Sequence, residues 1–194
     1  MQPAFVLFSG LPGTGKSTLA DRLAHELRWP LLRIDDIASL LGSAADHGTV
    51  AFWDRAIAAL LYLTEAQLKL GVNVIADSVF MDRDRYHARA IARQTGARFL
   101  PVHTFVSDEL VWEQRVTARH AASAPADGVA SWERIQVQRR GFRPWEPGTA
   151  LPVDTIRPPE ENFAAVLAYV TDPGTKIRSL PETAFTPGKY HEYE

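Results

Sequence analysis

The sequence of 194 residues contains no cysteine. This absence excludes disulfide bonds, a thiolate nucleophile and a zinc site built from cysteines. The sequence also has no apolar run that approaches the length of a membrane span. No basic stretch followed by an apolar core precedes the first predicted strand, as a signal peptide would require. We therefore expect a soluble, cytoplasmic protein with no membrane partner.

The chain also lacks a large excess of charge of either sign. Its 21 lysines and arginines nearly balance its 23 aspartates and glutamates, for a formal net charge of −2. Such a chain has no general attraction to nucleic acid, so a long polynucleotide is not the favoured partner. A hydrophobic fraction of 46% is sufficient for the core of one domain of this length.

The clearest functional signal is a glycine-rich stretch near the N-terminus. Gly10, Gly15, Lys16 and Ser17 occupy the four fixed positions of the phosphate-binding pattern G-x-x-x-x-G-K-[ST]. An apolar run over residues 4–8 precedes the pattern, and apolar residues at helical spacing follow it. This order of strand, loop and helix places a bound phosphate at the N-terminus of a helix.

The residue types of this stretch predict ATP and Mg²⁺ as cofactors. Backbone amides of such a loop form an anion-binding nest, the lysine reaches the β- and γ-phosphates, and the Ser17 hydroxyl binds Mg²⁺. We call residues 10–18 the P-loop. The residues predicted to contact the nucleotide are Gly10, Leu11, Pro12, Gly13, Thr14, Gly15, Lys16, Ser17 and Thr18.

Short apolar runs alternate with helical patterns over residues 1–170, which we interpret as one domain. This alternation predicts an α/β fold with a parallel sheet that is covered by helices on both faces. The predicted strands are 4–8, 31–34, 72–76, 98–105 and 153–156. The predicted helices are 19–27, 37–41, 51–70, 82–95, 109–120, 131–141 and 160–170. Residues 171–194 contain three prolines and little apolar periodicity, and they are predicted to form an irregular tail.

Three aspartates follow predicted strands, where ligands of parallel sheets bind. Asp35 and Asp36 come after the second strand. One of them could accept a proton from an attacking hydroxyl, while the other caps the next helix. Asp77 follows the third strand, and we predict that it holds the metal on Ser17, directly or through water.

Residues 108–145 are predicted to form a helical lid. Arg115 and Arg119 lie one helical turn apart and therefore share a helix face. They precede a small, polar segment, residues 121–130, which we expect to be mobile. Lid arginines can neutralise charge on a transferred phosphoryl group. The predicted catalytic residues are Lys16, Asp35, Asp36, Arg115 and Arg119.

Four segments, taken in order, resemble the small P-loop kinases. This group includes the kinase domain of bacteriophage polynucleotide kinase, chloramphenicol phosphotransferase and related AAA-domain ATP-binding proteins. The similar segments lie at residues 10–18, 33–36, 74–78 and 113–119, and 153–155 resemble the last strand, next to which the adenine is expected.

The resemblance covers about residues 4–170 and implies a five-stranded parallel sheet in the order 2-3-1-4-5, Mg²⁺-ATP and a lid that carries arginines. It matches Asp36 to the base of polynucleotide kinase. That kinase has an arginine three residues after its base, where this sequence has Ser39, and this difference disfavours a polynucleotide 5′-hydroxyl as acceptor.

Together these signals predict a Mg²⁺-ATP-dependent kinase that phosphorylates a hydroxyl of a small acceptor molecule. A nucleotide or polynucleotide 5′-kinase is an alternative of the same class. An ATP-binding switch with slow hydrolysis is an alternative of another class. An aspartate after the second strand favours a kinase, since a switch has no need of a base there.

Overall fold

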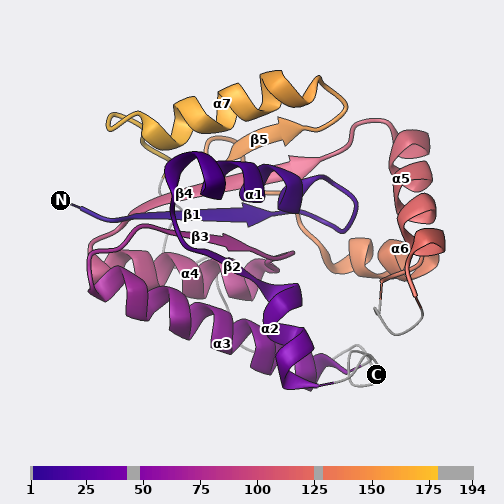
Figure 1. Cartoon of the computed structure of the whole chain (residues 1–194), viewed down its shortest axis with the longest axis horizontal. Coiled ribbons are helices and arrows are strands. Elements are labelled where there is room, and N and C mark those ends of the chain that lie inside the picture. Colours follow the sequence, from indigo (N-terminus) through magenta and orange to yellow (C-terminus); the bar gives the residue numbers. More distant parts are fainter. Residues whose placement is uncertain (1, 43–48, 125–128, 179–194) are drawn as a thin grey trace.

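The computed structural model describes residues 2–42, 49–124 and 129–178 (Figure 1). Five parallel strands form one sheet in the order β2-β3-β1-β4-β5, which confirms the topology implied by the resemblance. The strands are β1 (Ala4–Ser9), β2 (Leu31–Arg33), β3 (Val74–Asp77), β4 (Arg98–Phe105) and β5 (Leu151–Asp154).

Helices lie on both faces of the sheet, as the alternating pattern predicts (Figure 1). One face packs against α1 and α7, and the other packs against α2, α3 and α4. The helices are α1 (Lys16–Leu27), α2 (Ile34–Leu41), α3 (Val50–Lys69), α4 (Asp82–Thr95), α5 (Glu109–Ala122), α6 (Trp132–Gly141) and α7 (Pro159–Thr171). None of the helices in the described part of the chain is long and apolar enough to cross a membrane.

Alternation of side chains along β1 explains how this central strand supports both layers. All six residues of β1 are buried. Phe5 and Leu7 point into the core shared with α3 and α4, whereas Val6 and Phe8 point into the core shared with α1 and α7. Fully burying a side chain of this size stabilises the fold by about 1.5–3 kcal/mol. The strand that leads into the P-loop is therefore held from both sides.

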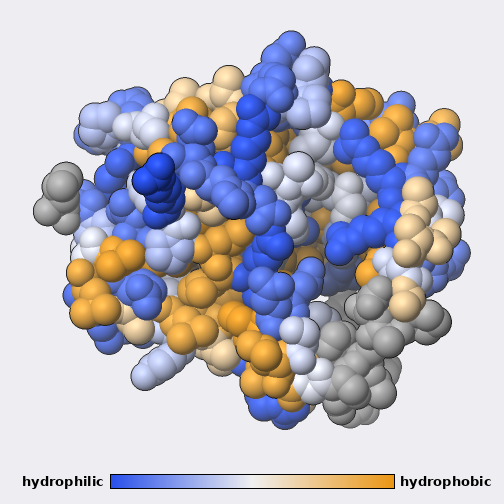
Figure 2. All heavy atoms as spheres, in the orientation of Figure 1, coloured by the Kyte–Doolittle hydropathy of each residue, from blue (hydrophilic) through white to orange (hydrophobic). Residues whose placement is uncertain are grey.

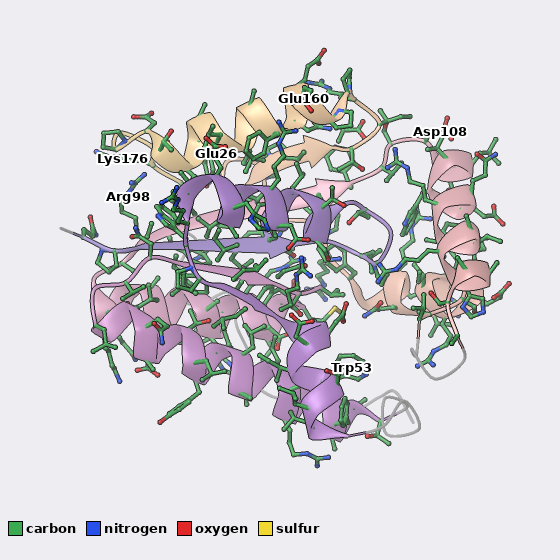
Figure 3. All side chains as sticks on the ribbon, in the orientation of Figure 1. Glu26, Trp53, Arg98, Asp108, Glu160 and Lys176 are labelled. Carbon is green, nitrogen blue, oxygen red and sulfur yellow. The ribbon has the colours of Figure 1, made fainter. Side chains whose placement is uncertain are left out.

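A third, smaller core joins the predicted lid to the P-loop. Leu11 of the P-loop packs with Trp112 and Val116 of α5 and with Ile135 of α6. Asp108 begins α5 by accepting hydrogen bonds from the amides of the first helical turn, and Figure 3 shows it at the end of α5 that is nearer α7. The base of the lid is thus packed onto the nucleotide loop. Residues 125–128 of the segment predicted to be mobile lie outside the described residues.

The second strand is shorter than predicted, and this changes where two candidate residues lie. Strand β2 ends at Arg33, and α2 begins at Ile34, whose side chain is buried. Asp35 and Asp36 consequently lie in the first turn of α2, not at the end of a strand. Acidic residues are favourable there because the N-terminus of a helix carries partial positive charge. Strand β5 also begins two residues before its predicted start.

The described part of the predicted tail is irregular. Helix α7 ends at Thr171, and residues 172–178 contain neither helix nor strand. The backbone carbonyl of Asp172 accepts a hydrogen bond from Arg98 at 2.6 Å. The remainder of the tail, residues 179–194, lies outside the described residues.

Candidate active site

The P-loop connects β1 to α1 in a conformation that requires glycine. Gly10 and Gly13 have φ angles of 152° and 79°. A Cβ at Gly10 would overlap the carbonyl oxygen of Thr104, and a Cβ at Gly13 would lie 2.6 Å from Cγ2 of Val116. The loop is therefore in close contact with β4 on one side and with α5 on the other, and only glycine permits both contacts.

Hydrogen bonds inside the P-loop hold the backbone carbonyl group of Leu11 in a fixed orientation. The carbonyl oxygen of Leu11 accepts hydrogen bonds from Thr14 Oγ1 at 2.7 Å and from Lys16 Nζ at 3.3 Å. The Thr14 hydroxyl also bonds the Thr104 hydroxyl at 2.8 Å. These bonds fix the conformation of the loop, whose backbone amides can then form an anion-binding nest.

Lys16 and Asp77 form the buried electrostatic centre of the site. Burial lowers the pKa of Lys16, whereas the carboxylate of Asp77 raises it. Burial raises the pKa of Asp77, and both Lys16 and a hydrogen bond from Ser17 counteract that rise. The two residues are only 9% and 4% exposed. Each charge is costly alone, and the pair is stabilised by mutual attraction in surroundings of low dielectric constant.

The residues present suit the Mg²⁺ ion that the P-loop implies. Asp77 Oδ1 is buried and has no hydrogen-bond partner in the described part of the chain. Its carboxyl group also bonds Ser17, the residue whose hydroxyl is expected to bind Mg²⁺. Magnesium uses one or two protein oxygens together with phosphate oxygens and water, so no larger cluster of acidic residues is needed. Ser17 and Asp77 would hold the ion.

The structure separates the two candidate bases in α2. Asp35 acts electrostatically on both Lys16 and Asp77, whereas Asp36 acts on neither. Adjacent residues of a helix point about 100° apart, so they cannot both face the same site. Both side chains are exposed to solvent. Asp35 is therefore the one that lies near the P-loop lysine, although the resemblance matched Asp36 to the base.

The two lid arginines also differ in their surroundings. Arg119 is near enough to Lys16 to lower the pKa of that lysine. Arg115 instead donates hydrogen bonds to Oγ1 and to the carbonyl oxygen of Thr155, each at 3.0 Å. Thr155 directly follows β5 and lies against Gly15. Arg119 thus lies near the P-loop lysine, while Arg115 connects α5 to the segment after β5.

Hydrophilic side chains surround the space between these elements. Figure 2 shows a hollow in the surface between α1 and α2 on one side and α5 on the other, and its rim is mainly hydrophilic. In Figure 3, side chains of α5 extend toward the side of α1 that carries the P-loop. The P-loop, Asp35 and Arg119 come from elements that border this hollow.

The sequence matches the AAA domain family AAA_33 over residues 5–145. The chain belongs to this family. The match runs from β1 through α6, so it includes the P-loop, α2 with its two aspartates, Asp77 and both lid arginines. No curated protein matches the sequence.

Solved structures similar to this AAA-domain chain include kinases and a protein solved with ADP-AlF3. A candidate kinase from Chloroflexus aurantiacus is 28% identical, with a TM-score of 0.68 and coverage of 88% of this chain and 95% of that chain. APS kinase CysC of Mycobacterium tuberculosis, solved with AMPPNP and APS, is 21% identical (TM-score 0.63; 86% and 96% covered). Kti12 of Chaetomium thermophilum, solved with ADP-AlF3, is 18% identical (TM-score 0.67; 87% and 100% covered). Together with the family match, these similarities confirm the resemblance to small P-loop kinases. The structures of APS kinase and Kti12 are less than 25% identical to this chain and therefore establish the fold alone.

The role of Asp77 in this AAA-domain chain can be tested by removing its charge. We expect Asp77→Asn to raise the Mg²⁺ concentration that half-saturates Mg²⁺-ADP binding by about tenfold or more, since ligands and their immediate partners have effects of this size. Binding of metal-free ADP should be unchanged or tighter, because a negative charge near the phosphates is gone. Calorimetric titration of both nucleotide forms measures the difference. Equal weakening of both forms would show that Asp77 supports the loop and not the metal.

Sequence reasoning missed Arg85, a buried arginine beneath the site. It donates hydrogen bonds to the backbone carbonyls of Phe80 at 2.6 Å and of Arg143 at 2.7 Å. Its guanidinium lies 4.6 Å and 4.8 Å from the ring centroids of Phe142 and Trp145. Burial lowers the pKa of Arg85 to about 10, which leaves it charged at neutral pH. No spacing in α4 marks Arg85, since its partners come from distant segments.

His103 of β4 gives the fold a specific sensitivity to acid. Burial and the positive charge of Arg85 lower the pKa of His103 from 6.5 to about 4. The unfolded chain therefore binds a proton more tightly than the folded chain, and stability falls as the pH drops from about 6.5 toward 4. Between pH 7.5 and pH 5 this histidine should cost up to about 2 kcal/mol of unfolding free energy.

We expect His103→Phe to remove that loss, because an apolar ring retains the contacts with Phe105 and Phe142. Urea unfolding of both proteins at the two pH values measures the effect as a difference. The raised pKa values of Asp77 and Asp84 act in the opposite direction but cancel in this comparison. An equal pH dependence in the two proteins would contradict the assignment.

Proposed function

We propose that this protein is a Mg²⁺-ATP-dependent kinase that transfers the γ-phosphoryl group to a hydroxyl of a small acceptor molecule. One observation carries the proposal: α2 begins directly after Arg33, which pairs with Asp77 in the sheet, so Asp35 in the first turn of α2 lies near Asp77 and influences both Lys16 and Asp77. A proton acceptor, a phosphate-binding lysine and a metal-binding carboxylate thus converge at the carboxyl edge of the sheet, where ligands of such sheets bind.

Each group has a distinct role in the proposed reaction. The P-loop amides and Lys16 hold the β- and γ-phosphates. Asp35 accepts the proton of the acceptor hydroxyl as its oxygen bonds the γ-phosphorus, and the bond from that phosphorus to the bridging oxygen of ADP breaks. When bound by Ser17 and Asp77, Mg²⁺ supplies positive charge to the phosphate oxygens. The products are ADP and a phosphorylated acceptor.

Arg119 is proposed to stabilise the charge of the transferred group. It is exposed, it is near Lys16, and no partner for its guanidinium is present in the described ranges. An arginine that becomes engaged only when charge develops on the phosphoryl group lowers the barrier more than it strengthens ATP binding. Arg115, which already bonds Thr155, is proposed to position α5 instead.

The position of Asp35 also supports a kinase over a switch that hydrolyses ATP slowly. A switch needs the P-loop and a metal site but no base for an alcohol. Similar structures include an APS kinase solved with APS and a gluconokinase from Sinorhizobium meliloti, and these names support a small molecule as the acceptor. A kinase that phosphorylates the 5′-hydroxyl of a nucleotide is an alternative, because it would catalyse the same class of reaction.

A panel of acceptors tests the proposal directly. The protein is incubated with Mg²⁺ and ATP labelled in the γ-phosphate, together with pools of sugars, nucleosides, amino alcohols and short oligonucleotides. We expect label in one pool and ADP release that depends on that pool. The same slow release of phosphate with every pool, and no labelled product, would favour the switch.

A further inference from the structure

The P-loop of this chain is bonded to the predicted lid through the backbone carbonyl of Pro12. The indole Nε1 of Trp112 donates a hydrogen bond of 2.9 Å to the carbonyl oxygen of Pro12. In the part of the chain that the structure describes, this is the hydrogen bond that Pro12 accepts. The carbonyl of Leu11, by contrast, is satisfied from within the loop by Thr14 and Lys16.

Packing makes this contact specific. The Trp112 ring is 5% exposed, and Trp132 of α6 packs edge-on against it with ring centroids 4.9 Å apart. Arg139 is on α6, and its guanidinium lies 5.4 Å from the centroid of the Trp112 ring. Val116, one turn further along α5, fills the space where a side chain at position 13 would lie. The indole is consequently held in one orientation against the apex of the loop.

The direction of the Pro12 carbonyl matters for phosphate binding. An anion nest works because successive amides converge on the anion while the carbonyls point away from it. If the Pro12 peptide rotated, its carbonyl oxygen would approach the phosphate and one amide would leave the nest. The indole N–H of Trp112 opposes that rotation, since a partly buried carbonyl that loses its partner is unfavourable.

We propose that Trp112 is a positioning residue for the P-loop: its indole N–H holds the Pro12 carbonyl outward and so keeps the loop amides aimed at the nucleotide phosphates. The inference rests on the proposed nucleotide-binding function and adds a lid residue to it. The P-loop of this protein is thus completed by α5 before any nucleotide arrives. The base of the lid and the loop form a single unit, held together by Leu11, Trp112 and Val116.

The chain offers a matched pair of substitutions for the test. Trp112→Phe removes the N–H group and keeps an aromatic ring, whereas Trp132→Phe makes the same chemical change at a ring in the same cluster that has no hydrogen bond to the loop in the described residues. Loss of one hydrogen bond should weaken Mg²⁺-ADP binding by about 3- to 10-fold in Trp112→Phe. In Trp132→Phe the dissociation constant should change less than twofold.

A second measurement needs no ligand. Hydrogen exchange of the peptide that covers residues 8–18 should be faster in free Trp112→Phe than in free Trp132→Phe, because the loop amides are less fixed. Site-specific incorporation of 3-benzothienylalanine at position 112 keeps the bicyclic shape and replaces N–H by sulfur. It should weaken binding as Trp112→Phe does, and it covers the case in which that variant folds poorly.

Calorimetry separates failure of this inference from failure of the proposed function. Wild-type protein that does not bind Mg²⁺-ADP would overturn both. Wild-type binding with equal affinities in Trp112→Phe, Trp132→Phe and the benzothienylalanine protein would overturn only the role of Trp112. A selective loss in the two proteins without the 112 N–H, together with faster exchange of the loop, is the result we expect.

Discussion

Replacing Lys16 with methionine is expected to slow turnover of Mg²⁺-ATP by about 10²–10³-fold, the size seen when one preorganised donor to developing charge is removed. Lys16 is 9% exposed and is attracted electrostatically by Asp77, so its ammonium acts on the phosphates in surroundings where water screens little. Methionine keeps the length of the buried stem but carries no charge. Transfer of labelled γ-phosphate, to the acceptor found in the panel or to water, measures the loss.

The fold should survive this change. Burial lowers the pKa of Lys16, so the ammonium is costly to bury, and Asp77 can take up a proton once its partner is gone. Lys69→Met is a suitable control, because that lysine is exposed on α3 and forms a surface ion pair with Glu65. Thermal unfolding monitored by circular dichroism checks both variants. Wild-type turnover in Lys16→Met would refute the assignment of the nucleotide site.

Local patterns were sufficient to predict the P-loop and the sheet. Gly10, Gly15, Lys16 and Ser17 carry their chemistry at fixed spacing, and the apolar runs of β1, β3 and β4 have no competing interpretation. The boundary after β2 was less predictable. Ile34 suits a strand or a buried helix position equally well, and packing against α3 decides between them. This single boundary determines which aspartate faces the P-loop.

Contacts between residues far apart in the chain could not be predicted from the sequence. The bond from Trp112 to Pro12 joins residues 100 positions apart, and Arg85 binds the backbone of Arg143 from 58 positions away. Neither contact leaves a periodic signal, because each depends on how the lid packs against the loop and the sheet. Repulsion between the arginines of the lid would favour a lid that opens when no nucleotide is bound. The apolar cluster around Leu11 and Trp112 instead fixes the base of the lid, so any opening must occur beyond it.

Substituting asparagine for each aspartate of α2 in turn should identify the base. Asp35→Asn is expected to slow phosphoryl transfer by about 10²–10⁴-fold, the usual contribution of a general base, while Mg²⁺-ADP binding stays nearly unchanged. Asp36→Asn should leave transfer close to the wild-type rate. The reason is placement: Asp35 acts on Lys16 and Asp77, and its neighbour points elsewhere around the helix.

The two variants control for each other unusually well. Both aspartates lie in the first turn of α2 and both are exposed, so each substitution removes the same favourable interaction with the helix N-terminus, worth about 0.3–1 kcal/mol. A difference in transfer rate between them therefore reports on chemistry and not on helix stability. Rapid-quench measurement of a single turnover separates transfer from product release.

Two outcomes would contradict this prediction. Slow phosphoryl transfer in Asp36→Asn together with a normal rate in Asp35→Asn would restore Asp36 as the base, as the resemblance implies. Loss of metal affinity alone in both variants would remove the general base from the mechanism and leave positioning and charge stabilisation to drive transfer.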